Sequence, residues 1–295
     1  MQLIHSAILG AIIGDIAGSK FEGHAKSTIP SDYDFFDDES VPTDDSIMTL
    51  AVLKAVQEKK GKLSDLATKY MRAYGAKYPS FGYGPSFFEW IFEDDPKPYN
   101  SCGNGAAMRI SSVGELKKGR HCIVKASKDV TGVTHNHPEG LKGAECVASV
   151  IDLCKPDTLS FNLFYPKGHN RLTVMKWVEM NYYSIPDYNT LLESNNSYGC
   201  GILCDQVIPQ TLSAFFSSNT YEEAVRKVIA LGGDTDTAGA ICGAMAGMFF
   251  GIPEDMVHQA VAKFSFDPEL VAQLDDYLSH MYQCRIEDTH DESNV

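Results

Sequence analysis

Apolar residues recur at helical spacing along most of the chain. Leu63, Leu66, Ala67, Tyr70, Met71 and Tyr74 fall on one face of a helix. A second such set, Ala224, Val225, Val228 and Ile229, follows Thr220 and Glu222-Glu223, a typical helix start. No stretch alternates strictly between apolar and polar positions with β-branched residues, so no strand is predicted. The pattern therefore predicts an all-α protein.

Prolines and loop-forming residues mark where these helices begin and end. Pro138 opens a helix that runs to about Cys154, and Pro268 opens the last helix, which runs to about Tyr282. Loops rich in Pro, Gly, Asn and Ser are expected at residues 23–43, 78–86, 94–104, 155–170 and 181–199. None resembles a domain linker, and no internal repeat is present. We expect a single domain, residues 1–286, followed by a disordered acidic tail, residues 287–295.

Two of the expected helices are rich in glycine and other small residues, one from Gly10 through Gly18 and the other from Ala238 through Gly247. Glycine inside a helix costs about 1 kcal/mol relative to alanine. Close approach of two helix backbones in a crowded core would explain this composition. Although both segments are apolar, the first has no basic leader and is interrupted by Asp15, and the second is too short to cross a bilayer. We expect buried core helices, and no signal peptide or membrane span.

The net charge of the chain limits which kinds of ligand and partner are expected to bind. The 295 residues include 25 Lys and Arg against 39 Asp and Glu, a formal charge of −14. Such a surface repels a phosphate backbone, so general nucleic-acid binding is not expected, although a helix N-terminus or a bound cation can still hold a small phosphate ligand. Eight cysteines occur without a CxxC pair, which favours reduced, buried thiols in a cytoplasmic protein.

Two acidic clusters, far apart in sequence, each precede an apolar helix. The first is Thr43-Asp44-Asp45-Ser46, and the second is Asp234-Thr235-Asp236-Thr237. Either cluster alone can be explained as a helix cap. A cap needs only one such side chain, however, and adjacent carboxylates repel unless a positive charge lies between them. Oxygen ligands of this kind suit Mg²⁺, and the absence of clustered His and Cys ligands disfavours zinc.

Two further segments have the composition of a ligand site. Residues 100–109, Asn-Ser-Cys-Gly-Asn-Gly-Ala-Ala-Met-Arg, form a glycine-rich turn that runs into a helix, which suits an anion but also an ordinary helix-capping turn. Residues 134–140 contain His135 and His137 before Pro138. This pair suits either a metal or a polar loop in which one histidine contacts the ligand, and we favour the second interpretation.

Together these motifs resemble a known family. The stretches GAIIGDIAGSKFEG, PTDDSIMTLAV, SCGNGAAMR with THNHPEGLKGAE, and LGGDTDTAGAICGAMAGMFFGIP are similar to those of the ADP-ribosylglycohydrolases, in the order typical of that family, from about residue 7 to 253. The resemblance implies an all-α fold around a binuclear Mg²⁺ centre, in which Mn²⁺ can substitute. It implies an ADP-ribose-modified protein or an ADP-ribose derivative as substrate.

The resemblance also assigns roles to individual residues. The metal ligands would be Thr43, Asp44, Asp45, Asp234, Asp236 and Thr237. The substrate-binding residues would be Ser101, Gly103, Asn104, Gly105, Met108 and His135. Glu22 would lie near the bond that is cleaved. Cys102 occupies a position where some relatives carry an aromatic residue stacked on adenine, so Tyr99 or Phe81 would have to supply the ring here.

The expected reaction is hydrolysis at the anomeric carbon of the distal ribose, through an oxocarbenium-like transition state. Bound metal would orient the sugar and polarise water. Glu22, Asp44 or Asp45 would transfer the proton, although Glu22 also fits a solvated loop charge. Two other functions stay open: a two-metal phosphohydrolase acting on a nucleotide or pyrophosphate, and a non-catalytic ADP-ribose-binding or crystallin-like relative.

The acceptor is the part of the substrate that these motifs do not identify. Arginine, serine, poly(ADP-ribose) and a small O-acyl ester all fit the family. Aromatic residues of the 78–100 segment, namely Tyr83, Phe87, Phe88 and Trp90, either shape the acceptor side of the cleft or, as their helical spacing favours, belong to the core. We expect a monomer.

Overall fold

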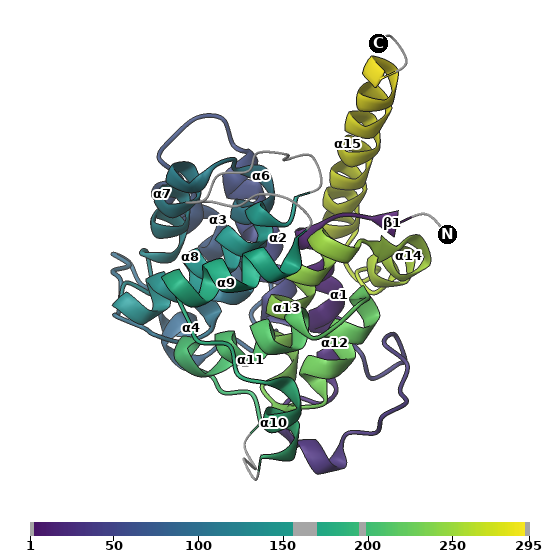
Figure 1. The fold of residues 1–295 in the computed structure, drawn as a ribbon. Helices are drawn as coiled ribbons and strands as arrows, with labels where there is room; N and C mark the ends of the chain where they lie inside the picture. Colours follow the sequence, from purple (N-terminus) through teal and green to yellow (C-terminus); the bar gives the residue numbers. More distant parts are fainter. Residues whose placement is uncertain (1–2, 156–169, 195–198, 293–295) are drawn as a thin grey trace.

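Two helices of small residues, α1 (Ala7–Ser19) and α13 (Thr235–Phe250), lie against each other at the centre of the molecule (Figure 1). The computed structural model describes residues 3–155, 170–194 and 199–292. In the contact between the two helices, a Cβ atom added to Gly14 would lie 2.0 Å from the carbonyl oxygen of Gly239, and one on Gly10 would lie 2.2 Å from that of Gly243. The predicted close approach of two helix backbones is confirmed.

The other helices cover this central pair, in agreement with the predicted all-α class. They are α2 (Asp44–Gln57), α3 (Leu63–Lys77), α4 (Pro85–Phe92), α5 (Gly105–Met108), α6 (Ser111–Leu116), α7 (Arg120–Thr131), α8 (Pro138–Leu153), α9 (Arg171–Asn181), α10 (Tyr188–Glu193), α11 (Cys204–Phe216), α12 (Tyr221–Ile229), α14 (Glu254–Ala262), α15 (Pro268–Glu292) and the 3-10 turn η1 (Lys26–Thr28). Helices α11 and α12 pack on α13, while α2 packs on α1 and α3.

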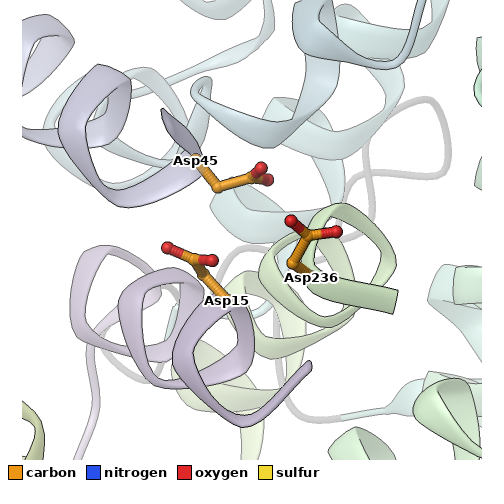
Figure 2. Close-up of side chains that lie close together, drawn as sticks. All are labelled: Asp15, Asp45 and Asp236. Carbon is orange, nitrogen blue, oxygen red and sulfur yellow. The ribbon is translucent and has the colours of Figure 1, made fainter. Parts of the chain in front are cut away.

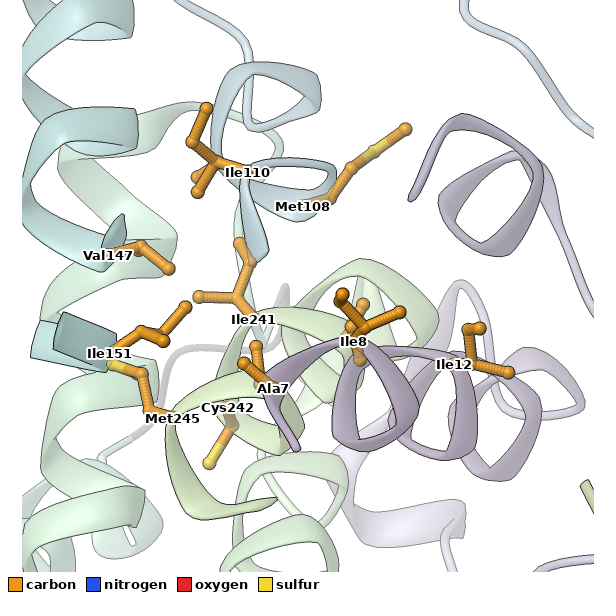
Figure 3. Close-up of a cluster of buried hydrophobic side chains, with 14 of the residues drawn as sticks. Ala7, Ile8, Ile12, Met108, Ile110, Val147, Ile151, Ile241, Cys242 and Met245 are labelled. Atoms are coloured by element: carbon orange, nitrogen blue, oxygen red, sulfur yellow. The ribbon is translucent and has the colours of Figure 1, made fainter. Parts of the chain in front are cut away.

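Part of the hydrophobic core lies between α1, α13 and α8 (Figure 3). Ile8 and Ile12 of α1, Ile241 of α13 and Val147 and Ile151 of α8 are all fully buried. Burying each such side chain contributes roughly 1.5–3 kcal/mol relative to leaving it exposed. Apolar packing therefore fixes the relative position of α1 and α13, the two helices that carry part of the candidate site. No helix within the described residues is long and apolar enough to cross a bilayer.

Four strands of two residues each form pairs within the described part of the chain, although none was predicted. Strand β1 (Leu3–Ile4) pairs with β4 (Ile252–Pro253), and β2 (His24–Ala25) pairs with β3 (Gly232–Gly233), both antiparallel. Two residues are too few to produce a visible alternation of apolar and polar positions. The β2–β3 pair matters for the site, because it joins the segment after Glu22 to the segment before Asp234.

Helix boundaries depart from the prediction in two places. Helix α15 continues to Glu292, beyond the expected end at Tyr282, because no Gly or Pro interrupts residues 283–292. The expected tail at 287–295 therefore overlaps this helix up to residue 292. The predicted loop 181–199 contains α10, whose N-cap Asp187 accepts a hydrogen bond from Thr190 N at 2.9 Å. Most of the predicted loop 155–170, and residues 195–198, lie outside the described ranges.

Candidate metal centre and ligand cavity

Three buried aspartates from three different helices meet beside the α1–α13 contact (Figure 2). Asp15 comes from α1, Asp45 from the first turn of α2, and Asp236 from the first turn of α13. One carboxylate oxygen of each lies within 4.8 Å of the corresponding oxygen of the other two. The two acidic clusters singled out in the sequence are thus adjacent in space, and a third carboxylate from the apolar helix α1 joins them.

Asp15 is a site residue that the sequence analysis missed. Its two carboxylate oxygens accept hydrogen bonds from the backbone N atoms of Thr43 and Ser46, each at 3.0 Å, and from the Thr43 hydroxyl at 2.7 Å. The Ser46 hydroxyl donates to the same carboxylate. Asp15 therefore caps the N-terminus of α2 and orients Thr43. A charged residue inside an apolar helix was the available signal, because such a residue is rarely buried without partners.

A direct hydrogen bond links the two predicted clusters. The Thr237 hydroxyl, at the start of α13, donates to Asp45 Oδ2 at 3.1 Å. Thr43 is the N-cap of α2, and its hydroxyl oxygen accepts from Asp45 N at 3.3 Å. On the other side of the site, the Asn104 amide donates to Asp234 Oδ2 at 2.7 Å. The N-terminal ends of α2 and α13 and the glycine-rich loop therefore form one continuous polar network.

Repulsion and burial make this cluster costly without a cation. Burial, followed by the charge of Asp236, raises the pKa of Asp45 well above its ordinary value. Burial also raises the pKa of Asp236, and it raises the pKa of Asp44 to about 8, with Asp15 and Asp234 adding repulsion. Asp45 Oδ1 and Asp236 Oδ1 are buried and have no hydrogen-bond partner among the described residues. Carboxylate oxygens left unpaired in this way fit a hard divalent cation, so the cluster can hold metal ions.

A cavity of about 520 Å³ opens next to the cluster. Its walls include Asp44, Asp234, Asp236, Thr237 and Glu22 on one side. They also include the predicted substrate-binding residues Ser101, Gly103, Asn104, Gly105, Met108 and His135. Of the site residues predicted from the sequence, only Thr43 and Asp45 are not part of its wall. The carboxylates and the glycine-rich loop therefore face the same space, which is large enough for a ligand of drug-like size.

Glu22 lies at the edge of this cavity, on an exposed turn after α1. It also lines a neighbouring cavity of about 580 Å³, together with His24, Gln206 and Asp234. Partial desolvation, followed by the nearby charge of Asp234, raises the pKa of Glu22. The turn is held in place, because Gly23 N donates to Gly233 O at 2.7 Å. Glu22 is thus fixed where the two cavities adjoin.

The glycine-rich loop is held by the segment before α11. Asn104 N donates to Ile202 O at 2.9 Å, and Cys204 N donates to Cys102 O at 3.0 Å. The helix that follows the loop, α5, is a single turn, so its dipole contributes little to anion binding. Tyr99 and Cys102 line the cavity, whereas Phe81 does not. Of the two rings considered for stacking on adenine, only that of Tyr99 is part of the wall of this cavity.

The structure also places the two histidines of residues 134–140 and the aromatic residues of the 78–100 segment. His137 Nδ1 accepts from Glu139 N at 3.1 Å, which makes it the N-cap of α8, whereas His135 is buried and lines the cavity. In the 78–100 segment, Phe87 and Trp90 are buried in the core, as their helical spacing favours. Phe87 also lines the cavity, and Phe88 is exposed. Within the described residues, His135 and His137 are therefore not part of a cluster with metal-ligand spacing.

Comparison with known proteins agrees with this arrangement. The family model for ADP-ribosylglycohydrolase matches residues 2–285. The chain is 22% identical to ADP-ribosylhydrolase ARH3 of Gallus gallus, over 83% of this chain and 84% of that protein. It is 23% identical to ADP-ribosylhydrolase ARH3 of Homo sapiens, over 86% and 87%. An uncharacterized protein of Archaeoglobus fulgidus is 29% identical, over 60% of this chain and 58% of that protein.

A solved structure described as an ADP-ribosylglycohydrolase-related protein complex has a similar fold. It superposes with a TM-score of 0.64 at 19% identity and covers 91% of this chain and 94% of its own. At this identity the structural match supports the fold alone, while the family model spans nearly the whole sequence. This chain belongs to the ADP-ribosylglycohydrolase family and is a hydrolase of that family.

Proposed function

We propose that this protein cleaves the glycosidic bond between ADP-ribose and a modified acceptor, and that it releases intact ADP-ribose. The acceptor is a protein side chain, a poly(ADP-ribose) chain or an O-acyl group. One observation carries the proposal: the buried carboxylate cluster and the glycine-rich loop line a single cavity, with Glu22 at its edge. The ARH3 relatives, which are ADP-ribosylhydrolases by name, support the same chemistry.

The proposed metal centre contains two Mg²⁺ ions, with Mn²⁺ as a substitute. Thr43, Asp44 and Asp45 of the first cluster and Asp234, Asp236 and Thr237 of the second would hold them. This assignment fits the unpaired oxygens of Asp45 and Asp236 and the hydrogen bond that joins the clusters. When bound, Mg²⁺ supplies electrostatic stabilisation of oxygen atoms and alignment of the distal ribose. Asp15 has a supporting role, because its carboxylate accepts hydrogen bonds from the backbone N atoms of Thr43 and Ser46 at the N-terminus of α2.

Among the three carboxylates considered for proton transfer, we assign the role to Glu22. Asp45 is 1% exposed, does not line the cavity, and accepts a hydrogen bond from Thr237, so it cannot reach the substrate. Asp44 faces the cavity but belongs to the proposed metal ligands. Glu22 faces both cavities, and its raised pKa favours proton exchange at its carboxyl oxygen. ADP-ribose would occupy the cavity of the glycine-rich loop, and the acceptor would leave through the neighbouring one.

The loop itself would hold the diphosphate and the adjoining ribose. Glycine at 103 and 105 keeps that space open, because a Cβ atom on Gly105 would lie 3.2 Å from His135 Nε2 and one on Gly103 would lie 3.2 Å from Ser101 Oγ. Asn104, whose amide contacts Asp234, would connect the diphosphate subsite to the metal ligands.

The test is an incubation with arginine-, serine- and poly-ADP-ribosylated substrates and with an O-acyl ester of ADP-ribose, with Mg²⁺ and with chelator, in which products are identified by mass. We expect Mg²⁺-dependent release of intact ADP-ribose from one of them, which also identifies the acceptor. AMP as the product would instead indicate the two-metal phosphohydrolase. Binding of ADP-ribose without release from any substrate would indicate a non-catalytic relative.

A further inference from the structure

Arg109 is a fully buried cation beside the ligand cavity that the proposed reaction does not use. It is 1% exposed and follows the glycine-rich loop and α5 directly. Its Nη2 atom donates to the Thr134 hydroxyl at 2.6 Å and contacts His135 Nδ1 at 3.2 Å. Its guanidinium lies 4.9 Å from the centre of the Phe87 ring. Both Arg109 and His135 contribute to the cavity wall.

The contact with Arg109 determines which nitrogen of His135 carries the proton. A guanidinium group can only donate hydrogen bonds, so Nδ1 must accept the one from Arg109. The Thr134 hydroxyl lies 2.8 Å from the same nitrogen and 3.4 Å from Thr131 O, so its single proton can go to either acceptor. With Nδ1 accepting from Arg109, the proton of the neutral ring resides on Nε2. Burial, followed by the charge of Arg109, lowers the pKa of His135 well below its ordinary value, so the doubly protonated form is disfavoured.

The protonated nitrogen faces the glycine-rich loop. A Cβ atom added to Gly105 would lie 3.2 Å from His135 Nε2, and one added to Gly103 would lie 3.6 Å from it. Because both residues are glycines, neither of them places a side chain beside Nε2. A donor fixed at this point suits a ligand oxygen, and it suits a phosphate oxygen best because hydrogen bonds to charged acceptors are the stronger ones.

We infer that Arg109 is a positioning residue that holds His135 as a neutral Nε2–H donor toward the diphosphate of the ligand. This inference rests on the proposed function for the identity of the ligand, but its structural half applies to the ligand-free protein. Arg109 also brings one positive charge close to the bound diphosphate, which a neutral side chain at this place would not supply. The pair therefore selects for a phosphate-bearing ligand over a nucleoside.

A purely structural role for Arg109 makes a different prediction. Burial lowers the pKa of Arg109, while the nearby charges of Asp44 and Asp45 oppose this lowering, so the guanidinium also offsets part of the acidic cluster. If that were its only role, the tautomer of His135 would not depend on it. The tautomer is therefore the readout that separates the two roles, because loss of stability alone would follow from either.

The first experiment is a long-range ¹H–¹⁵N NMR spectrum of the full-length protein, labelled at histidine nitrogens, without ligand. We expect the resonances of His135 to show a protonated Nε2 and an unprotonated Nδ1. A protonated Nδ1 in the wild type would overturn the inference and would leave the proposed function intact. This measurement needs no variant, so a folding defect cannot obscure it.

Variants then test the link to binding, with ADP-ribose as the probe in isothermal titration calorimetry. Arg109→Met should lose the fixed tautomer and weaken ADP-ribose binding about 10- to 100-fold, the loss expected for one hydrogen bond to a charged group. The comparison variant Thr134→Val removes a hydrogen-bond partner of both His135 Nδ1 and Arg109 Nη2 but keeps the guanidinium, and should retain the Nε2–H tautomer. Arg109→Met with an unchanged tautomer or unchanged affinity would contradict the inference.

Substitution at His135 provides the rescue test. Glutamine places an amide donor close to the position of Nε2, so His135→Gln should bind ADP-ribose more tightly than His135→Leu, by about tenfold or more. Equal affinities of the two variants would show that no donor is needed at this place. If the wild type itself fails to bind ADP-ribose while His135 shows the expected tautomer, the proposed function fails and the assignment of the tautomer stands.

Discussion

Replacement of Gly14 by alanine tests how the fold assembles the metal centre. Gly14 precedes Asp15 in α1, and a Cβ atom here would lie 2.0 Å from the Gly239 carbonyl oxygen and 2.5 Å from its carbon. Ordinary contact begins at about 3.4 Å, so α1 and α13 would have to separate by about 1.4 Å (3.4 − 2.0) or distort. The atoms in contact belong to backbone, and no side chain can rotate away.

Two effects of opposite sign determine how much Gly14→Ala changes the free energy of unfolding. Alanine is favoured over glycine inside a helix by about 1 kcal/mol, which alone would stabilise the variant. Overpacking against a rigid core costs about 3 kcal/mol at the upper end of its common range. The expected net loss is about 2 kcal/mol or more of unfolding free energy, and thermal unfolding should shift down by roughly 4–8 °C, at about 2–4 °C for each kcal/mol.

The separation of α1 and α13 should also move the carboxylates of the acidic cluster. Asp15 and Asp236 lie on the two helices that separate, so the rise in melting temperature on adding Mg²⁺ should shrink together with the catalytic rate. Circular dichroism melts with Mg²⁺ and with chelator measure both effects. Gly84→Ala is the stability control, because its Cβ would meet nothing within 4 Å, and a change below about 1 kcal/mol is expected. A Gly14→Ala protein that is as stable as the wild type, with the same response to Mg²⁺, would refute this reasoning.

Three other predictions follow from the site. Asp45→Ala should abolish Mg²⁺-dependent release of ADP-ribose while its helical circular dichroism persists in Mg²⁺-free buffer, and an unfolded variant would point to a structural cap instead. Glu22→Gln should lower kcat about 100-fold or more in a steady-state assay and leave the Mg²⁺-induced melting shift unchanged, since Glu22 is not a proposed ligand; a lost melting shift would argue against this division of roles. The last prediction concerns pH dependence in chelator. The pKa of Asp44 is raised from 3.8 to about 8 in the folded protein, so the folded protein binds more protons than the unfolded chain between about pH 4 and pH 8. The free energy of unfolding should therefore fall as the pH rises through that range. Urea denaturation at pH 5 and pH 8 should show a smaller fall for Asp44→Asn than for the wild type, and equal falls would show that Asp44 does not titrate in this way.

Local sequence patterns were sufficient for the helical class and for the two acidic clusters. The clusters at Thr43 and Asp234 could be recognised because each has more oxygen-bearing side chains than a helix cap needs. The contact between α1 and α13 was predictable from the glycines, whose unfavourable helix propensity requires compensation. These features depend on composition within one segment, which a single sequence displays directly.

The features that were missed depend on contacts between segments. Asp15 appeared only as an interruption of an apolar helix, and its role depends on hydrogen bonds to Thr43 and Ser46, about thirty residues away. Arg109 was part of a recognised motif but had no assigned role, because its partners Thr134 and His135 come from another loop. The two-residue strands β2 and β3 show no periodicity, yet they hold the turn that carries Glu22. Tertiary pairing of this kind has no local signature.

The most direct test of the metal centre is calorimetric titration of Mg²⁺ into the chelator-treated, full-length protein, with Asp236→Ala as the comparison. The account predicts two ions bound per chain in the wild type, and loss of at least one of them in a variant that keeps its helical circular dichroism. Absence of Mg²⁺ binding by the wild type, or binding that Asp236→Ala leaves unchanged, would contradict the assignment of this acidic cluster as the metal centre.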